Sequence, residues 1–382
     1  MTASRRSRID PFHVMEVMRA AEERAMAGGE VLHLEVGQPS TPAPVTAIDA
    51  AKRALDAERL GYTSAKGIPA LRERIARRYA ERHGVDVAPD HIIVTVGASG
   101  GFSLGFLSAF DVGDRVAVSA PGYPCYRNVL EAFGIEAVVI PVDASTRFNL
   151  TPDLLAEHGP LDGVLVASPA NPTGTILTPA ELGALVDHCR GHGIRIVADE
   201  IYHGITFTDE PVQSLLEHDR TGIVLQSFSK YWSMTGWRVG WVVAPDDLVQ
   251  PMERLKQNLF ISAPTIGQIA ALAALDADDE LEANVARYAV NRPIVLDGLA
   301  EMGCTTVAPA DGAFYAYAGI SHLERTASDL CASWLDELGV AVTPGIDFDP
   351  VRGEEFIRIS FSESTEDVAE AMRRLVGWVG ER

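Results

Sequence analysis

The chain has 382 residues, which is long enough to bury more than one hydrophobic core, and we therefore expect two domains. Its 53 acidic residues outnumber its 32 basic residues, so the net charge is -21 at pH 7. Nucleic acids are bound through basic surface, and this balance argues against a nucleic-acid partner. No apolar run approaches the ~20 residues of a membrane-spanning helix, so no membrane partner is expected.

The cysteines and histidines do not form a pattern that predicts disulfides or a metal site. The four cysteines, at positions 125, 189, 304 and 331, are scattered along the chain, which is typical of reduced thiols in a cytoplasmic protein. The polar, basic N-terminus is not followed by an apolar stretch, so no signal peptide is expected. His188, Cys189 and His192 fall near one predicted helix end, but no further ligand follows with metal-binding spacing.

Helix boundaries are marked at the start of the chain by proline and glycine. Asp10 and Pro11 predict the beginning of a helix that ends at Gly28. Pro69 and Gly84 bound a second stretch, in which apolar residues recur every three or four positions as in an amphipathic helix.

From residue 91 onward, apolar runs alternate with helical patterns, which indicates an α/β layer with a mostly parallel sheet. Strands are expected at 91–96, 115–120, 164–167, 194–198 and 239–244. A long amphipathic helix is expected after the acidic residues 276–280. Two later runs, 313–318 and 356–361, alternate like strands with one covered face.

A glycine-rich turn, Gly97-Ala-Ser-Gly-Gly101, separates the first strand from a helix predicted at 102–110. Such a turn presents free backbone N–H groups to an anion, so we expect it to hold a phosphate group. The turn lacks the spacing of a dinucleotide-binding loop and of a P-loop, which disfavours both kinds of site.

The segment from Ser227 to Arg238 predicts a catalytic amine at Lys230. Burial near other cations lowers the pKa of a lysine and frees its lone pair for Schiff-base chemistry. Trp232 and Trp237 can keep water away, while Ser227, Ser229 and Arg238 can bind an anionic group.

This segment, S-x-S-K-x-aromatic-x-M-x-G-x-R, resembles the pyridoxal-phosphate signature of the class I/II aminotransferases of fold type I. Further matches follow the family's order along nearly the whole chain: Gly37, Tyr62, the Gly97 turn, Tyr123, Asn171-Pro-Thr-Gly174, Asp199-Glu-Ile-Tyr202 and Arg358. The resemblance implies an α/β fold with a mostly parallel seven-stranded sheet between helices. It places a large domain at 45–281 and a smaller discontinuous α+β domain at 1–44 and 282–382.

The resemblance also implies a role for each matching residue around a pyridoxal 5'-phosphate cofactor. The phosphate would be held by Ala98, Ser99, Ser227, Ser229 and Arg238, and the ring by Tyr123, Asn171, Asp199 and Tyr202. An aspartate facing the pyridine nitrogen keeps it protonated, which makes the ring an electron sink. The substrate carboxylate would meet Arg358, Gly37 and Asn171. Tyr62 would reach the cofactor of a neighbouring subunit, which implies a homodimer.

The activity implied by the resemblance is transamination between an α-amino acid and a 2-oxo acid, with Lys230 forming the Schiff base and moving the α-proton. A carbon-sulfur β-lyase and a non-catalytic cofactor-binding regulator remain alternatives.

The sequence also bears on the amino donor. Aspartate-preferring relatives often carry an arginine, contributed by the neighbouring subunit, in the stretch that matches residues 258–262. Here no Lys or Arg occurs between Lys256 and Arg287. A neutral aliphatic or aromatic donor is therefore predicted, with Leu259 and Phe260 near its side chain. Lys66 is the residue that could instead supply the missing cation.

Overall fold

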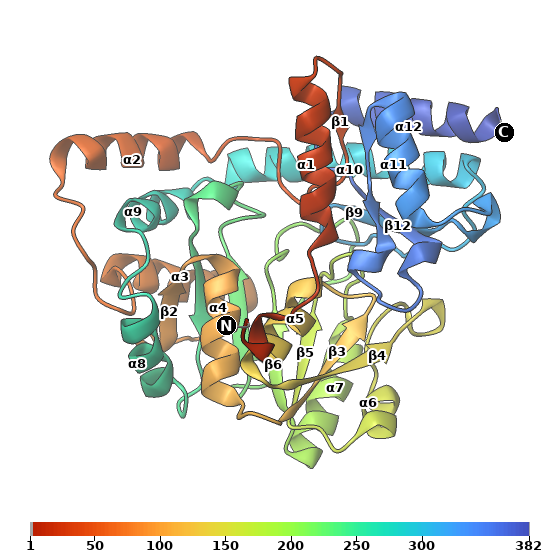
Figure 1. Cartoon of the computed structure of the whole chain (residues 1–382). Helices are drawn as coiled ribbons and strands as arrows, with labels where there is room; N and C mark the ends of the chain where they lie inside the picture. Colours follow the sequence, from red (N-terminus) through yellow and green to blue (C-terminus); the bar gives the residue numbers. More distant parts are fainter. Residues whose placement is uncertain (1–2, 382) are drawn as a thin grey trace.

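The computed structural model describes residues 3–381, and its main element is a seven-stranded sheet (Figure 1). The strands lie in the order β2 (Ile92–Thr95), β8 (Gly240–Val243), β7 (Ile223–Ser227), β6 (Arg195–Asp199), β5 (Gly163–Ala167), β3 (Arg115–Ala120) and β4 (Glu136–Pro141). Strand β8 is antiparallel to both of its neighbours, and the other pairs are parallel. The predicted α/β class and the mostly parallel sheet are confirmed.

Helices cover both faces of this sheet, because successive strand residues point to opposite sides. One face packs against α4 (Gly97–Ala109), α5 (Pro124–Phe133) and α8 (Val249–Leu259). The other face packs against α3 (Pro69–His83), α6 (Pro152–His158), α7 (Pro179–His192) and α9 (Thr265–Ala274), and α2 (Val45–Ala57) lies beside α9. In β6, for example, Ile196 belongs to the second core and Val197 to the first. Two covered faces explain why these strands are almost entirely apolar.

A second group of elements combines the two ends of the chain, as Figure 1 shows. Strand β1 (Leu32–His33) pairs with β10 (Val340–Ala341), and β12 (Phe356–Ser360) lies between β11 (Thr343–Pro344) and β9 (Tyr315–Gly319). The surrounding helices are α1 (His13–Met26), α10 (Asp278–Glu301), α11 (Ala327–Leu338) and α12 (Thr365–Gly380). The predicted boundary at 281/282 falls inside α10, and the division into domains stays a prediction.

The expectation that 313–318 and 356–361 have only one covered face is wrong. Every residue of β12 after Phe356 is buried, and so is every residue of β9 before Gly319. Neighbouring residues that point to opposite faces of this sheet, such as Ala316 and Tyr317 in β9, both belong to the core, so both faces are covered.

Two predicted helix starts are also wrong. Helix α1 begins at His13 rather than at Pro11, because its first N–H groups are bound from far along the chain. The Asp347 carboxylate accepts hydrogen bonds from the backbone N–H groups of His13 and Val14, each at 3.0 Å. Helix α4 begins at Gly97, so the glycine run forms its first turns instead of preceding it. The Pro69 start and Gly84 end of α3 are confirmed.

A polar loop connects the small sheet to the large one. The Asp349 carboxylate accepts hydrogen bonds from the backbone N–H groups of Val351 and Arg352 and pairs with Arg352 Nε at 3.1 Å. Arg352 Nη2 in turn donates to the carbonyls of Val142, at 2.9 Å, and Ala120, at 3.4 Å. The loop therefore ties the region around β12 to the ends of β3 and β4.

Within residues 3–381, no helix is long and apolar enough to cross a membrane. The same part of the chain contains no group of three or more His, Cys, Asp or Glu side chains arranged to hold a metal ion. All four cysteines are free thiols.

Candidate active site

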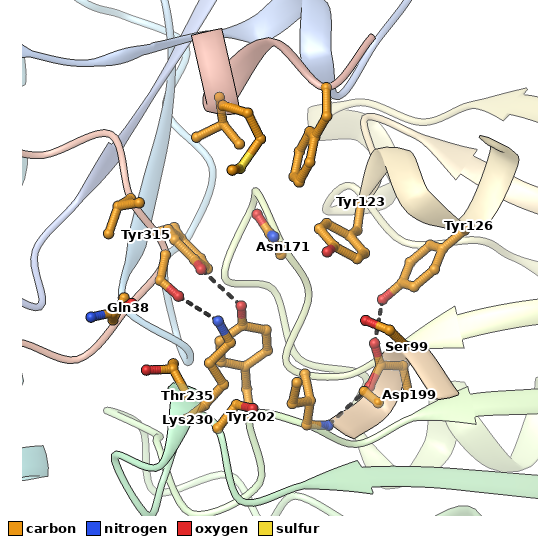
Figure 2. Close-up of a pocket in the computed structure, with 18 of the residues that line it drawn as sticks. Gln38, Ser99, Tyr123, Tyr126, Asn171, Asp199, Tyr202, Lys230, Thr235 and Tyr315 are labelled. Atoms are coloured by element: carbon orange, nitrogen blue, oxygen red, sulfur yellow. Dashed lines mark hydrogen bonds between the residues drawn. The ribbon is translucent and has the colours of Figure 1, made fainter. Parts of the chain in front are cut away.

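A cavity of about 310 Å³ lies at the carboxyl ends of the parallel strands, where α/β sheets bind ligands. Asp199 ends β6, Asn171 follows β5 and Lys230 follows β7, so three neighbouring strands each deliver one polar side chain. Figure 2 shows Lys230, Tyr202 and Tyr315 on one side of this cavity and Asp199, Tyr126 and Ser99 on the other.

Most of the predicted site residues line this cavity: Gly37, Ala98, Ser99, Tyr123, Asn171, Asp199, Tyr202, Ser229, Lys230, Arg238 and Arg358. The structure does not place two others there. Ser227 is buried beneath the cavity, and Tyr62 projects from the surface with 84% of its area exposed. The individual roles assigned to these residues stay predictions.

Lys230 lies beside Tyr202 in the cavity wall, and its Nζ donates a hydrogen bond to the Gly37 carbonyl (Figure 2). Burial lowers the pKa of this lysine to about 8, and the nearby guanidinium groups of Arg358 and Arg238 act in the same direction. A substantial fraction of the amine is therefore neutral near physiological pH, which is the form that attacks a carbonyl carbon.

Asp199 presents a carboxylate at the end of β6. It accepts hydrogen bonds from the Tyr126 hydroxyl, at 2.6 Å, and from the Ile201 backbone N–H, at 3.1 Å. Burial raises the pKa of Asp199 to about 6, while these two donors and Lys230 favour its charged form. A cationic N–H group in the cavity would stabilise the carboxylate further, so the site fits a protonated ring nitrogen.

The start of α4 forms an anion cradle with Arg238. Gly97 has a φ of +65°, and a Cβ at this position would clash with the Arg238 guanidinium, so only glycine allows this close approach. Ser99 and Ser229 line the cavity nearby, and Ser227 Oγ holds Ser229 Oγ at 2.9 Å. Free N–H groups at a helix start, hydroxyls and a guanidinium together fit a phosphate group.

Arg358 is buried in the centre of the small sheet. Its Nη1 donates to Asn171 Oδ1 at 3.1 Å, and its Nη2 donates to the Glu35 carbonyl. Nη2 also donates to Thr343 Oγ1 at 3.3 Å, and the buried Nε has no hydrogen-bond partner among the described groups. An arginine on an edge strand is usually exposed to solvent. Arg358 instead lies on β12, which is the central strand of its sheet.

Two tyrosines at the cavity were not found from the sequence. The Tyr315 hydroxyl forms a 2.8 Å hydrogen bond with the Tyr202 hydroxyl, and Arg358 Cζ lies 4.5 Å from the Tyr315 ring centroid. Tyr315 also fills the space that a side chain at position 37 would need, so Gly37 is required for packing as well. The other tyrosine is Tyr126, which follows the predicted Tyr123 by one helical turn; this spacing was the available signal.

We expect Tyr315→Phe to lower kcat/KM about three- to tenfold, because a hydrogen bond of this kind contributes about 0.5–1.5 kcal/mol. Steady-state kinetics on the purified variant measure the change. Tyr317→Phe is the matched control: this tyrosine lies two positions along the same strand, and its buried hydroxyl has no partner among the described residues. Equal losses in both variants would contradict a specific role for the Tyr315–Tyr202 hydrogen bond.

The apolar wall of the cavity was also missed. Helix α1 and the residue before it contribute Phe12, Val14, Met15 and Met18. Met15 is 53% exposed, although methionine is a residue that usually packs in a core. The sequence predicted the helix but could not show what it faces.

The loop around Tyr62 is fixed by contacts within the chain. The Thr265 hydroxyl donates to the Gly61 carbonyl at 2.6 Å, and Lys256 Nζ donates to the carbonyl of Ala65. Lys66 does not line the cavity of its own chain, since its Nζ lies 3.3 Å from the Asp90 carbonyl and 3.8 Å from Glu253 Oε2. The loop therefore presents Tyr62 outward in a defined position.

These features are those of an α/β enzyme. Its reactive amine lies in a cavity between the large sheet and the smaller one. Residues 29–375 match the family described as aminotransferase class I and II. The chain is 47% identical over 378 residues to valine--pyruvate aminotransferase of Mycobacterium tuberculosis, with 98% of this chain and 97% of the relative covered. It is 32% identical over 390 residues to aspartate aminotransferase of Thermotoga maritima, with 100% of both chains covered.

The crystal structure of an aminotransferase from Mycobacterium tuberculosis matches this fold with a TM-score of 0.98 and 46% identity, over 100% of both chains. The chain therefore belongs to the class I and II aminotransferase family, and it is a transaminase. The predicted family, fold type and reaction are confirmed, and the two relatives carry transaminase names rather than those of a lyase or a regulator. Members of this family depend on pyridoxal phosphate and act on amino acids and 2-oxo acids.

Proposed function

We propose that this transaminase binds pyridoxal 5'-phosphate and transfers the amino group of a neutral α-amino acid, aliphatic or aromatic, to a 2-oxo acid. Ser99, Ser229 and Arg238 would hold the phosphate, and Asp199 would face the ring nitrogen. Lys230 would hold the cofactor covalently. When bound, the cofactor supplies an electron-withdrawing ring that stabilises negative charge at the substrate's α-carbon.

The residues of this chain would supply positioning and proton transfer. Arg358 and Asn171 would bind the α-carboxylate and so orient the Cα–H bond toward Lys230. Lys230 Nζ would accept the α-proton and later return it, a role that suits an amine with a pKa of about 8. Tyr202 and Tyr315 would hold the ring's polar edge through their shared hydrogen bond.

A neutral donor is supported by the charges of the cavity. Among the described residues that line it, the only Lys and Arg side chains are Lys230, Arg238 and Arg358, and the proposed chemistry occupies all three. No cation is left for a second carboxylate, whose burial without a partner costs several kcal/mol. The apolar side chains of Phe12, Val14, Met15 and Met18 instead offer contacts to an aliphatic or aromatic side chain.

We also propose that the enzyme is a cytoplasmic homodimer in which Tyr62 completes the neighbouring site. The outward projection of Tyr62 from a fixed loop supports this arrangement. Leu259 and Ile261, close to that loop's anchor at Lys256, are each about half exposed, as expected for residues that a partner covers. The free thiols support the cytoplasmic location.

The donor is tested by single-turnover reactions, followed through the cofactor's absorbance, with alanine, valine, methionine, phenylalanine, glutamate and aspartate at equal concentrations. We expect the best neutral amino acid to react at least about a hundredfold faster than aspartate, because ~2.7 kcal/mol of uncompensated desolvation corresponds to that factor. A faster reaction with aspartate, abolished by Lys66→Ala, would contradict the neutral donor and assign the missing cation to Lys66.

A further inference from the structure

Thr343 is a buried threonine beside Arg358 to which the proposed mechanism assigns no role. It lies in β11, directly opposite Arg358 of β12 in the antiparallel register, and none of its surface is exposed. Directly opposite residues of two paired strands lie on the same face of a sheet. Strand pairing therefore places the Thr343 hydroxyl next to the Arg358 guanidinium.

The Thr343 hydroxyl connects two groups at once. Its Oγ1 donates a hydrogen bond to the Glu35 carbonyl at 2.8 Å and accepts one from Arg358 Nη2 at 3.3 Å. A hydroxyl has one donor and two acceptor sites, so it satisfies both contacts together. Arg358 Nη2 also donates to the same Glu35 carbonyl. The guanidinium, the hydroxyl and the carbonyl thus each contact the other two.

Two aromatic rings lie against the Arg358 guanidinium but do not orient it. Arg358 Cζ is 4.5 Å from the ring centroid of Tyr315 and 4.7 Å from that of Phe348. The attraction between a cation and a ring acts on the charge as a whole and does not direct individual N–H groups. The directions of the N–H groups must therefore be set by hydrogen-bond acceptors.

These acceptors lie on two sides of the guanidinium. Nη1 donates to Asn171 Oδ1 at 3.1 Å, and Asn171 lines the catalytic cavity. Nη2 is held by the Glu35 carbonyl and the Thr343 hydroxyl. In the proposed mechanism Asn171 itself binds the substrate, so only the contacts of Nη2 are independent of the substrate.

We propose that Thr343 is a positioning residue, which orients the Arg358 guanidinium for the α-carboxylate of the substrate. This inference rests on the proposed function, in which Arg358 binds that carboxylate. Valine has nearly the shape of threonine but can form neither hydrogen bond. With valine at position 343, Nη2 would retain one acceptor, and the guanidinium would be free to turn within its plane. The loss is therefore expected mainly in the affinity for the amino acid.

The experiment uses the holoenzyme and the amino acid that reacts fastest with the unaltered enzyme. Single-turnover rates, followed through the cofactor's absorbance over a range of amino-acid concentrations, give an apparent Kd and a maximal rate. Thr343→Val is expected to raise the Kd about tenfold, as for loss of a hydrogen bond to a charged group, and to change the maximal rate less than about threefold. Thr343→Ser keeps the hydroxyl and is expected to stay within about twofold of the unaltered Kd.

Two further variants show whether the effect acts through Arg358. In an Arg358→Leu enzyme, adding Thr343→Val is expected to change the Kd less than about twofold, because the group that Thr343 orients is absent. Thr365→Val is the matched control. The Thr365 hydroxyl donates to Asn291 Oδ1 at 2.7 Å at the start of α12, and neither residue lines the catalytic cavity. This control is expected to leave the Kd unchanged.

An unchanged Kd in Thr343→Val would overturn the proposal, as would an equal loss in Thr343→Ser or Thr365→Val. If Thr343→Val does not fold, Thr343→Cys takes its place, because a thiol is only a weak hydrogen-bonding group. Equal affinity of the Cys and Ser variants would then overturn the proposal. If Arg358→Leu alone leaves the Kd unchanged, the role proposed for Arg358 fails and the inference fails with it. That result is distinct from one in which Arg358→Leu weakens binding and Thr343→Val does not.

Discussion

Replacement of Lys230 with alanine is expected to reduce transamination by at least about a thousandfold. In the proposed mechanism the variant would lose both the covalent attachment of the cofactor and the group that moves the α-proton, and proton transfer by a positioned side chain alone contributes about 10²–10⁴-fold. Single-turnover kinetics measure the rate, and the absorption band of the covalently held cofactor is expected to be absent. A variant with wild-type turnover would remove Lys230 from the mechanism.

Lys256 provides the matched control, because burial also lowers the pKa of this second lysine to about 8. Its Nζ donates to the carbonyls of Ala65 and Val94, away from the catalytic cavity. Lys256→Met is therefore expected to lose stability but to keep the absorption band of the covalently held cofactor. Disappearance of that band would show that Lys230 is not its sole source.

The pH dependence of cofactor attachment follows from the same lysine. The neutral amine reacts, and the neutral fraction rises as the pH increases through the pKa of about 8. Association of pyridoxal phosphate with the cofactor-free enzyme is thus expected to accelerate with a midpoint near pH 8, rather than near the ordinary lysine value of about 10.4. Stopped-flow absorbance at constant ionic strength measures this midpoint.

Asp199→Ala is expected to lower kcat about 10²–10³-fold while the cofactor remains bound. In the proposed mechanism the Asp199 charge stabilises the transition state, whereas separate contacts to the phosphate hold the cofactor. Cofactor content and kcat are measured on the same preparation.

Tyr126→Phe removes only the hydrogen bond to Asp199, which favours the charged carboxylate. Loss of this hydrogen bond raises the pKa of Asp199, so the acid limb of the pH–rate profile is expected to move to higher pH. The rate is expected to recover at alkaline pH. An Asp199→Ala enzyme that loses its cofactor in proportion to its activity would contradict this division of roles.

Local sequence patterns predicted the α/β layer and most of its strands, whereas most of the cavity residues were predicted from the family resemblance. Five of the sheet strands were predicted as short apolar runs, and Asn171 and Asp199 lie just after or at the end of two of them; β7, the strand before Lys230, was not predicted. Because parallel strands end at the same edge of a sheet, the proximity of Asn171 and Asp199 follows from the alternation of strands and helices.

The features that were missed depend on contacts between distant parts of the chain. Asp347 fixes the start of α1 from more than 300 positions away, so no local signal at Asp10 or Pro11 could reveal it. Tyr315 of β9 meets Tyr202, which follows β6 and lies 113 positions earlier in the chain, so no local pattern could reveal this contact. The role proposed for Tyr62 would depend on a second chain, and the sequence around it shows only a tyrosine in a loop.

The attachment of α1 to Asp347 has a consequence for substrate length. Asp347 follows β11, and Thr343 of β11 pairs in register with Arg358 of β12. Arg358 and the apolar wall on α1 thus belong to one hydrogen-bonded unit, which fixes the separation between them. If Arg358 binds the substrate carboxylate, the fixed distance to the apolar side chains on α1 limits the length of the substrate side chain. We therefore expect reactivity within a series of straight-chain donors to rise to an optimum and then fall sharply when one more methylene no longer fits.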